Sequence, residues 1–225
     1  MLEIIATTVE DALLAEKGGA DRLELCAALS EDGLTPSAGC IEEVVKAVEI
    51  PVHVIVRPHN NGFIYSEADV AVMQKDIAFI RKTGAAGIVI GACTAEKMID
   101  VTVMETLLAE AGELAVTFHR AFDEIDDQLA ALKVLQTMPQ ITRVLTSAGK
   151  PSVLQALPQL KALVEATADS ELTILAGSGI TAEKVDEVLR TGVSEIHLGS
   201  GVREERSFAR PIDVELVREV QQKMT

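Results

Sequence analysis

The chain has 225 residues, of which 48% are hydrophobic and 24% are charged. This composition excludes a disordered or collagen-like chain, and the length is ample for a sizeable buried core. Asp and Glu number 35 against 20 Lys and Arg, so the formal net charge of −15 repels nucleic acid and anionic membranes. With no Trp and a single Tyr, platforms for base stacking are almost absent. We therefore expect no nucleic-acid partner and no membrane partner.

The cysteines and the first residues predict the compartment. Three cysteines (Cys26, Cys40 and Cys93) cannot all pair within one chain, and none lies close to another in sequence, which fits reduced thiols. The first ten residues, MLEIIATTVE, contain acids and no basic segment, so they do not resemble a signal peptide. No apolar run approaches the roughly 18 residues needed to span a bilayer. These features predict a cytoplasmic protein.

Short apolar runs alternate with stretches of helical periodicity along the whole chain. In chain order, the predicted strands are Leu2–Ala6, Arg22–Cys26, Val52–Arg57, Gly87–Gly91, Ala115–Arg120, Thr142–Thr146, Leu172–Ala176 and Glu195–Gly199. The predicted helices between and after them are Val9–Lys17, Ala38–Val48, Glu67–Lys82, Asp100–Ala111, Asp126–Thr137, Ser152–Thr167, Ala182–Arg190 and Ile212–Lys223.

This strict alternation of strand and helix predicts a parallel sheet, because parallel neighbours need a crossover long enough to hold a helix. Eight units without a break in composition favour closure into a (β/α)8 TIM barrel, a single α/β domain over residues 1–225. The alternative is an open doubly wound sheet. It is less favoured because no GxGxxG motif follows the first strand, which continues as IIATTVEDA.

Polar residues near the ends of the predicted strands identify the candidate site, because active sites of such barrels lie at the carboxyl ends of the strands. Strand residues two apart share a face, and this alternation assigns Glu24, Arg57, His119 and His197 to the lumen. Burying four titratable or cationic groups there costs free energy unless they pair with one another or serve a function. His53 lies at the amino end of its strand, where we interpret it as structural.

Three of these side chains each allow a functional and a structural interpretation. Glu24 is either a general base or a buried carboxylate neutralised by Arg22 or Arg57. The guanidinium of Arg57 suits a carboxylate or a phosphate, and its alternative is a salt bridge at the rim. His197 is either a catalytic imidazole or a packed, hydrogen-bonded one.

The segment after the fifth predicted strand offers a further catalytic group. His119 is followed by Arg120 and, in the next loop, by Asp123, either of which could orient the imidazole. The alternative is a packed core histidine. We interpret the acidic run from Asp123 to Asp127 as a helix cap rather than a cation site, since acids are common at helix amino ends.

The loops after the last two predicted strands favour an anion site, because barrels often bind a phosphate there through backbone N–H groups. Their residues are Gly177, Ser178, Gly179, Gly199, Ser200 and Gly201. The alternative is that these glycines only permit tight turns. A metal site is weakly indicated, because there is no CxxC or HExxH spacing. Cys26 and Cys93 lie at the ends of strands and could offer the soft thiolates that Cu(I) prefers, or be ordinary small core residues.

Five motifs together resemble the copper-homeostasis protein CutC family. They are GGADRLELC at 18–26, GLTPS at 33–37, IVRP at 55–58, TFHRAFD at 117–123 and RVLTS at 143–147. The resemblance runs through most of the chain. It implies a cytoplasmic TIM barrel associated with copper tolerance or Cu(I) binding, assembled as a homo-oligomer, either a dimer or a tetramer.

The chain also departs from the family pattern. Some relatives carry a Cys at the end of the first strand, proposed to bind Cu(I) together with the Cys that matches Cys26. Ile5 occupies that position here and cannot ligate a metal. The positions of Glu24, Arg57, His119, Asp123 and His197 match those typical of the family, and Ser178 interrupts a loop that is otherwise glycine only.

Two functions remain open from the sequence. The first is copper homeostasis with Cys26 as the Cu(I) thiolate. The second is a TIM-barrel enzyme without an organic cofactor, acting on a small phosphorylated or carboxylated metabolite by acid–base chemistry. In that second hypothesis Arg57 and the two Gly-Ser loops hold the anion, Glu24 and His119 exchange protons with the substrate, and Asp123 or Arg120 orients the imidazole.

Overall fold

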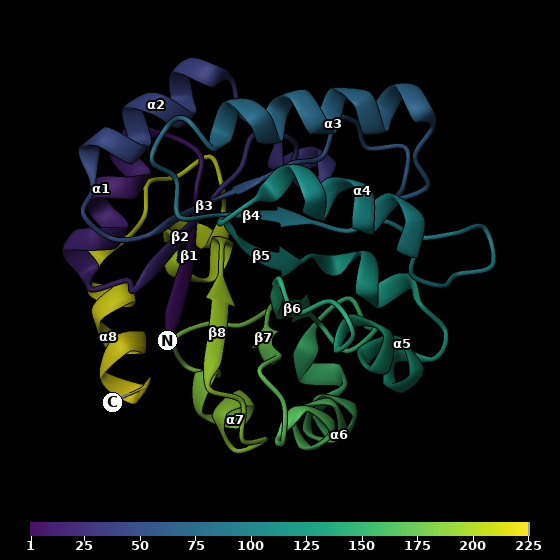
Figure 1. Cartoon of the computed structure of the whole chain (residues 1–225). Coiled ribbons are helices and arrows are strands. Elements are labelled where there is room, and N and C mark those ends of the chain that lie inside the picture. Colours follow the sequence, from purple (N-terminus) through teal and green to yellow (C-terminus); the bar gives the residue numbers. More distant parts are fainter. Residues whose placement is uncertain (225) are drawn as a thin grey trace.

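A computed structural model describes residues 1–224 as a closed barrel of eight parallel strands, each followed by a helix (Figure 1). The strands are β1 (Leu2–Ala6), β2 (Arg22–Leu25), β3 (Val52–Ile55), β4 (Gly87–Ile90), β5 (Ala115–Phe118), β6 (Ile141–Thr146), β7 (Thr173–Ala176) and β8 (Glu195–Leu198). The helices are α1 (Val9–Gly18), α2 (Ala38–Ala47), α3 (Glu67–Ile80), α4 (Val101–Ala111), α5 (Gln128–Leu135), α6 (Leu157–Thr167), α7 (Val185–Leu189) and α8 (Val214–Met224). The strands follow the chain order around the ring, which confirms the predicted TIM barrel.

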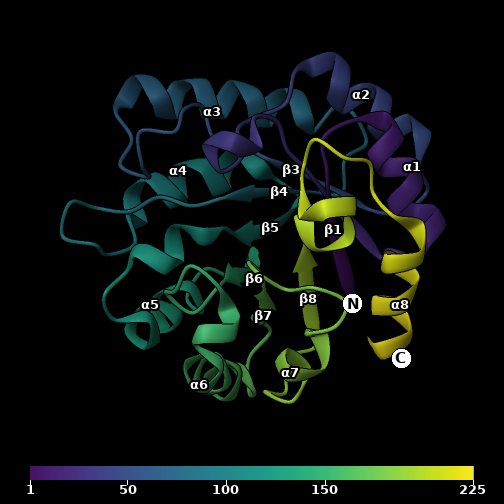
Figure 2. The same ribbon diagram turned by 180° about the vertical axis from the view of Figure 1, so that it is seen from behind.

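The strand β1 closes the ring by pairing with both ends of the sheet. In parallel register, Glu3 is aligned with Arg22 of β2 on one side and with His197 of β8 on the other. Helices α1 and α8 lie side by side over this seam, close to the amino terminus, in both Figure 1 and Figure 2. Residues far apart in sequence therefore meet at the seam.

Alternate strand residues face opposite sides of the barrel wall. In β1, Leu2 and Ile4 are fully buried in the main apolar core, which lies between the strands and the surrounding helices. Ile5 faces the lumen, where it packs with Cys26 in a second, smaller apolar cluster. The outward faces of the strands therefore hold the helices, and the inward faces are left for polar groups.

Several strands end earlier than predicted. The strand β5 ends at Phe118 because His119 caps a 3-10 turn, Arg120–Glu124, with its ring nitrogen accepting a hydrogen bond from the Ala121 N–H. Similarly, β3 ends two residues before Arg57. These candidate residues thus belong to the loops at the carboxyl rim rather than to the strands.

The last five helices also begin later than predicted, and the difference is largest for α6 and α7. The helix expected from Ser152 starts at Leu157, because Val153–Gln155 forms a separate 3-10 turn and a proline then begins the helix. The helix expected from Ala182 starts at Val185. Within residues 1–224, no helix has the length and apolar character required to cross a membrane.

Candidate functional site

The carboxyl ends of the strands surround a cavity of about 340 Å³, which we call the mouth cavity. Its charged and imidazole-bearing lining residues are Glu24, Asp32, Arg57, His119, Arg120, Asp123, Glu124 and His197. Its larger apolar lining residues are Ile5, Leu29, Ile55, Phe63, Leu145, Ile180, Leu198 and Phe208. The four side chains that strand alternation assigned to the lumen therefore line one cavity.

Beneath this cavity, four paired charges fill the lumen. Glu3 accepts a hydrogen bond from Arg22 Nε, while Arg22 Nη2 donates to Glu195 at 2.8 Å. Arg143 Nε donates to the same Glu195 oxygen at 2.9 Å. Burial opposes ionisation of Glu3, but Arg22 together with His197 and His53 outweighs burial and lowers the pKa of that carboxyl well below its usual range. We call these four residues the floor network, in which two acids balance two bases.

His197 connects the floor network to the mouth cavity. Its Nδ1 lies 2.7 Å from Glu3 Oε1, and its Nε2 lies 3.6 Å from Glu24 Oε2. Burial disfavours the charged imidazolium, but the hydrogen bond to Glu3 and the charge of Glu24 prevail and raise the pKa of His197. The Glu3 carboxylate thus fixes the ring so that its other nitrogen faces Glu24.

Glu24 is buried, and its partners differ from those expected. No ion pair within residues 1–224 joins it to Arg22 or Arg57, and its charged neighbour is His197. Burial raises the pKa of Glu24. The thiol of Cys26 hydrogen-bonds to Glu24, and burial together with that carboxyl raises the pKa of Cys26 well above its usual value. The thiol is therefore held in its protonated form.

Arg57 carries a buried positive charge at the wall of the cavity. Its Nη1 donates to the carbonyl oxygens of Glu31 at 2.9 Å and Gly33 at 3.2 Å, and its guanidinium lies 4.7 Å from the centre of the Phe63 ring. Its Nε has no hydrogen-bond partner, and no carboxylate within residues 1–224 forms an ion pair with it. The other buried arginines, Arg22 and Arg203, each pair with a carboxylate, and so does the half-buried Arg143.

His119 lines the same cavity as a neutral ring. Its Nδ1 accepts a hydrogen bond from the Ala121 N–H at 3.2 Å, so the ring proton is on Nε2, which has no partner in the described chain. Burial, reinforced by the charge of Arg57, lowers the pKa of His119 to about 3. At physiological pH this imidazole is therefore neutral and carries a hydrogen-bond donor at Nε2, and its proton exchange with a substrate stays a prediction.

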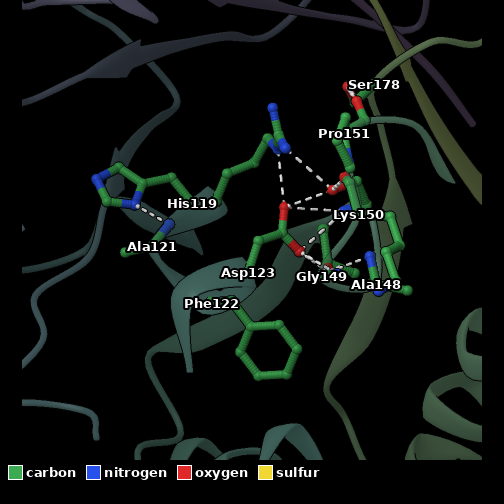
Figure 3. Close-up of polar contacts among 12 residues, drawn as sticks. His119, Ala121, Phe122, Asp123, Ala148, Gly149, Lys150, Pro151 and Ser178 are labelled. Carbon is green, nitrogen blue, oxygen red and sulfur yellow. Dashed lines mark hydrogen bonds and ion pairs between the residues drawn. The ribbon is translucent and has the colours of Figure 1, made fainter. Parts of the chain in front are cut away.

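The expected orienting contact between Asp123 and His119 is not formed. Figure 3 shows the imidazole bonded to the Ala121 backbone, while the Asp123 carboxylate points toward the loop after β6. That carboxylate accepts hydrogen bonds from Arg120 Nε at 2.8 Å, from Ser147 Oγ at 2.8 Å and from a further backbone N–H of this loop. Asp123 thus connects the loop after β5 to the loop after β6, and Arg120 takes part in the same contacts.

The two Gly-Ser loops lie at the rim of the cavity. Five of the six predicted anion-binding residues line it: Ser178, Gly179, Gly199, Ser200 and Gly201. Gly177 does not line it, because it packs against Leu145 and His197. The Ser178 hydroxyl donates to the carbonyl oxygen of Pro151 at 2.7 Å, so that hydroxyl is occupied within the protein.

A buried ion pair ties the segment after β8 to α1. Arg203 donates to both carboxylate oxygens of Asp11, at 3.0 and 2.7 Å. The same guanidinium lies 5.3 Å from the centre of the Phe208 ring, which lines the mouth cavity and packs against Gly199. This segment therefore forms a fixed part of the cavity wall.

The surroundings of Cys26 do not fit a Cu(I) site. The side chain packs with Ile5 and Ile55 in an apolar cluster, and its thiol is held protonated. The thiol of Cys93 is used elsewhere, as a donor to the carbonyl oxygen of Ala121 at 3.5 Å. Throughout residues 1–224, no group of three His, Cys, Asp or Glu side chains is placed to hold a metal ion. One protonated thiol is a poor donor set for copper.

Known proteins resemble this chain over most of its length. The model of the CutC family matches residues 1–202, a range that contains all eight strands. The chain belongs to the CutC family. The human copper homeostasis protein cutC homolog is 42% identical over 198 residues, covering 88% of this chain and 72% of the human protein. A CutC family protein of Yersinia pseudotuberculosis is 42% identical over 200 residues, covering 89% of this chain and 78% of that protein.

Solved structures confirm the fold of this CutC-family chain. The crystal structure of CutC from Streptococcus agalactiae superposes with a TM-score of 0.83 at 30% identity, covering 88% of this chain and 97% of that one. Thiamine phosphate pyrophosphorylase from Pyrococcus furiosus superposes with a TM-score of 0.62 at 17% identity, covering 99% and 94% of the two chains. The second likeness shows the shared barrel alone.

Proposed function

We propose that this CutC-family chain is an enzyme that binds a small anionic metabolite in the mouth cavity and acts on it by proton transfer. The observation that carries the proposal is the charge of Arg57, which is buried at the cavity wall and paired with no carboxylate of the described chain. The proposal needs no organic cofactor.

A buried charge without a counter-charge is unfavourable, and leaving one member of a buried ion pair alone typically costs about 3–5 kcal/mol. The carbonyl oxygens of Glu31 and Gly33 orient the guanidinium of Arg57 but do not neutralise it. A carboxylate or phosphate in the cavity would supply both the missing charge and the missing hydrogen bonds. The net charge of −15 opposes anions at long range, so these local donors must provide the affinity.

The other polar groups of the cavity support a catalytic role in addition to anion binding. Glu24 offers a carboxyl group for proton transfer, and His197 stands behind it at 3.6 Å. His119 offers a neutral N–H donor whose Nε2 has no partner among residues 1–224. An acid–base group and a donor that line one cavity with a cation are the elements needed to bind an anion and move a proton on it.

Isothermal titration with three probe anions tests the proposal: inorganic phosphate, pyruvate and dihydroxyacetone phosphate. We expect the wild-type protein to bind at least one of them. Arg57→Lys keeps the charge but loses the guanidinium fork, so it should weaken binding roughly tenfold or more.

The matched control is Arg218→Lys, which makes the same change at an exposed position on α8 and should bind as the wild type does. Circular dichroism verifies that both variants are folded. Binding of none of the probes, or equal binding by Arg57→Lys and the wild type, would contradict the proposal.

Copper binding stays a prediction of the family resemblance, supported by the name of the human relative. A Cu(I) site at Cys26 requires near-stoichiometric retention of Cu(I) against a competing chelator, lost in Cys26→Ala. The Cys26 thiol is buried and protonated, and the cavity contains no second thiol. We therefore expect the wild type and Cys26→Ala to retain Cu(I) equally weakly against the chelator. Tighter retention by the wild type would favour copper over the anion.

A cytoplasmic location and a homo-oligomeric assembly likewise stay predictions. Three free cysteines support a reducing compartment. Analytical ultracentrifugation measures the assembly state directly.

A further inference from the structure

Three polar groups reach the mouth cavity from different parts of the ring. Arg57 follows β3, His119 follows β5, and Glu24 lies in β2 with His197 of β8 behind it. A ligand in the cavity is therefore in reach of a cation, a neutral donor and a carboxyl group at once. This combination restricts the reaction more than anion binding alone does.

The neutral imidazole suits an oxygen atom that gains negative charge during a reaction. Since Nδ1 of His119 is fixed by the Ala121 N–H, the tautomer that remains carries its proton on Nε2. The nearby charge of Arg57 makes that site favourable for an oxyanion. A ligand carbonyl oxygen that becomes an enolate oxygen fits these two groups.

The carboxyl group of Glu24 is linked through His197 to Glu3 in the floor network. Its Oε2 lies 3.6 Å from His197 Nε2, and His197 Nδ1 lies 2.7 Å from Glu3. The charge of His197 favours the ionised form of Glu24, which is the form that can accept a proton, and Glu3 holds that imidazole without lining the cavity. In this arrangement Glu3 is a positioning residue.

The described cavity wall offers neither an amine for a Schiff base nor a thiolate nucleophile. The wall contains no lysine to form a Schiff base, the Cys26 thiol is held protonated, and the Ser178 hydroxyl donates to a backbone carbonyl. The remaining wall is mainly apolar, with Ile55 and Phe63 among its members. It leaves room for a short carbon chain beside the polar groups.

We infer that the substrate is a small carbonyl compound bearing a carboxylate or phosphate, and that the reaction removes and returns a proton at the carbon next to the carbonyl. This inference rests on the proposed anion-binding function. The Glu24 carboxylate takes the proton, the C–H electron pair forms the C=C bond of the enolate, and the carbonyl π pair moves onto the oxygen. His119 Nε2–H donates to that oxygen, and return of the proton from Glu24 to carbon completes the cycle without another reactant.

Proton exchange in D2O tests this inference without knowledge of the natural substrate. The probes are pyruvate, for a carboxylate, and dihydroxyacetone phosphate, for a phosphate. We expect 1H NMR to show protein-dependent loss of the signal of the protons next to the carbonyl in at least one of them. Glu24→Gln should slow this exchange roughly 100-fold or more while still binding the probe.

The matched control is Glu113→Gln, which changes an exposed glutamate outside the cavity and should exchange at the wild-type rate. His119→Phe should slow exchange about 100-fold, because it removes the oxyanion donor. A probe that binds through Arg57 without exchanging overturns this inference and leaves the anion site standing. Failure of both carbonyl probes to bind overturns this inference, and the anion site falls with it only where inorganic phosphate also fails to bind. Wild-type exchange by Glu24→Gln or His119→Phe overturns the assigned roles of these residues.

Discussion

Two histidines inside the barrel are buried in their neutral form. Burial lowers the pKa of His53 to about 4, and burial with the charge of Arg57 lowers that of His119 to about 3. The unfolded chain binds these protons near pH 6.5, whereas the folded protein does so only at lower pH. Their contribution to stability is therefore complete above pH 6.5 and is lost as the pH falls toward 4.

The substitution His53→Gln isolates this effect, because glutamine does not titrate. We expect the stability of the wild type relative to the variant to fall by roughly 1.4 kcal/mol per pH unit between pH 6.5 and 4. Urea denaturation of both proteins at pH 7, 6 and 5 measures the difference. Parallel dependence of the two proteins on pH would show that His53 is not buried as a neutral group.

Part of the candidate site could be predicted at this scale. Side chains alternate between the two faces of every strand. This rule correctly predicted that four residues line one cavity: Glu24, Arg57, His119 and His197. The same rule also places Glu3 in the lumen, two residues before Ile5, but an acid at the amino end of a strand carries no signal of the histidine that it will orient.

The loops after β7 and β8 interlock through a glycine. A Cβ on Gly201 would lie 1.9 Å from the carbonyl oxygen of Ile180, a contact that backbone atoms cannot relieve without moving. This close approach requires a glycine at position 201 independently of any anion bound by the loop. It also sets where the lining residue Ser200 lies.

We expect Gly201→Ala to destabilise the protein by about 1–3 kcal/mol, since it forces the two loops apart. The control Gly39→Ala meets no atom within 4 Å on the exposed side of α2, and it should be neutral or stabilising by up to about 1 kcal/mol. Thermal unfolding of the two variants checks this. Equal melting temperatures for both would contradict the interlocking of the loops.

The elements themselves were predictable, but their ends and some of their contacts were not. Eight apolar runs predicted eight strands, whereas β5 stops at Phe118 because the His119 ring caps the following 3-10 turn. That turn directs Asp123 to the loop after β6, although its spacing from His119 had suggested a contact. Likewise, Arg203 and Asp11 are 192 residues apart, and no local pattern pairs them.

At the scale of the whole molecule, the lumen is divided into two levels by charge. In the floor network, Arg22 and Arg143 are neutralised by Glu3 and Glu195. In the mouth above it, the Arg57 guanidinium donates to two backbone carbonyl oxygens and forms no ion pair with a carboxylate of residues 1–224. The closed ring explains both levels, because parallel strands deliver all of these side chains to one axis and leave one open end.

A crystal structure of the protein grown with pyruvate or inorganic phosphate would show whether Arg57 binds an anion. We expect the anion in the mouth cavity, with an oxygen about 2.7–3.2 Å from the Arg57 guanidinium. A cavity without the anion, in which Arg57 instead pairs with a carboxylate of its own chain, would contradict it.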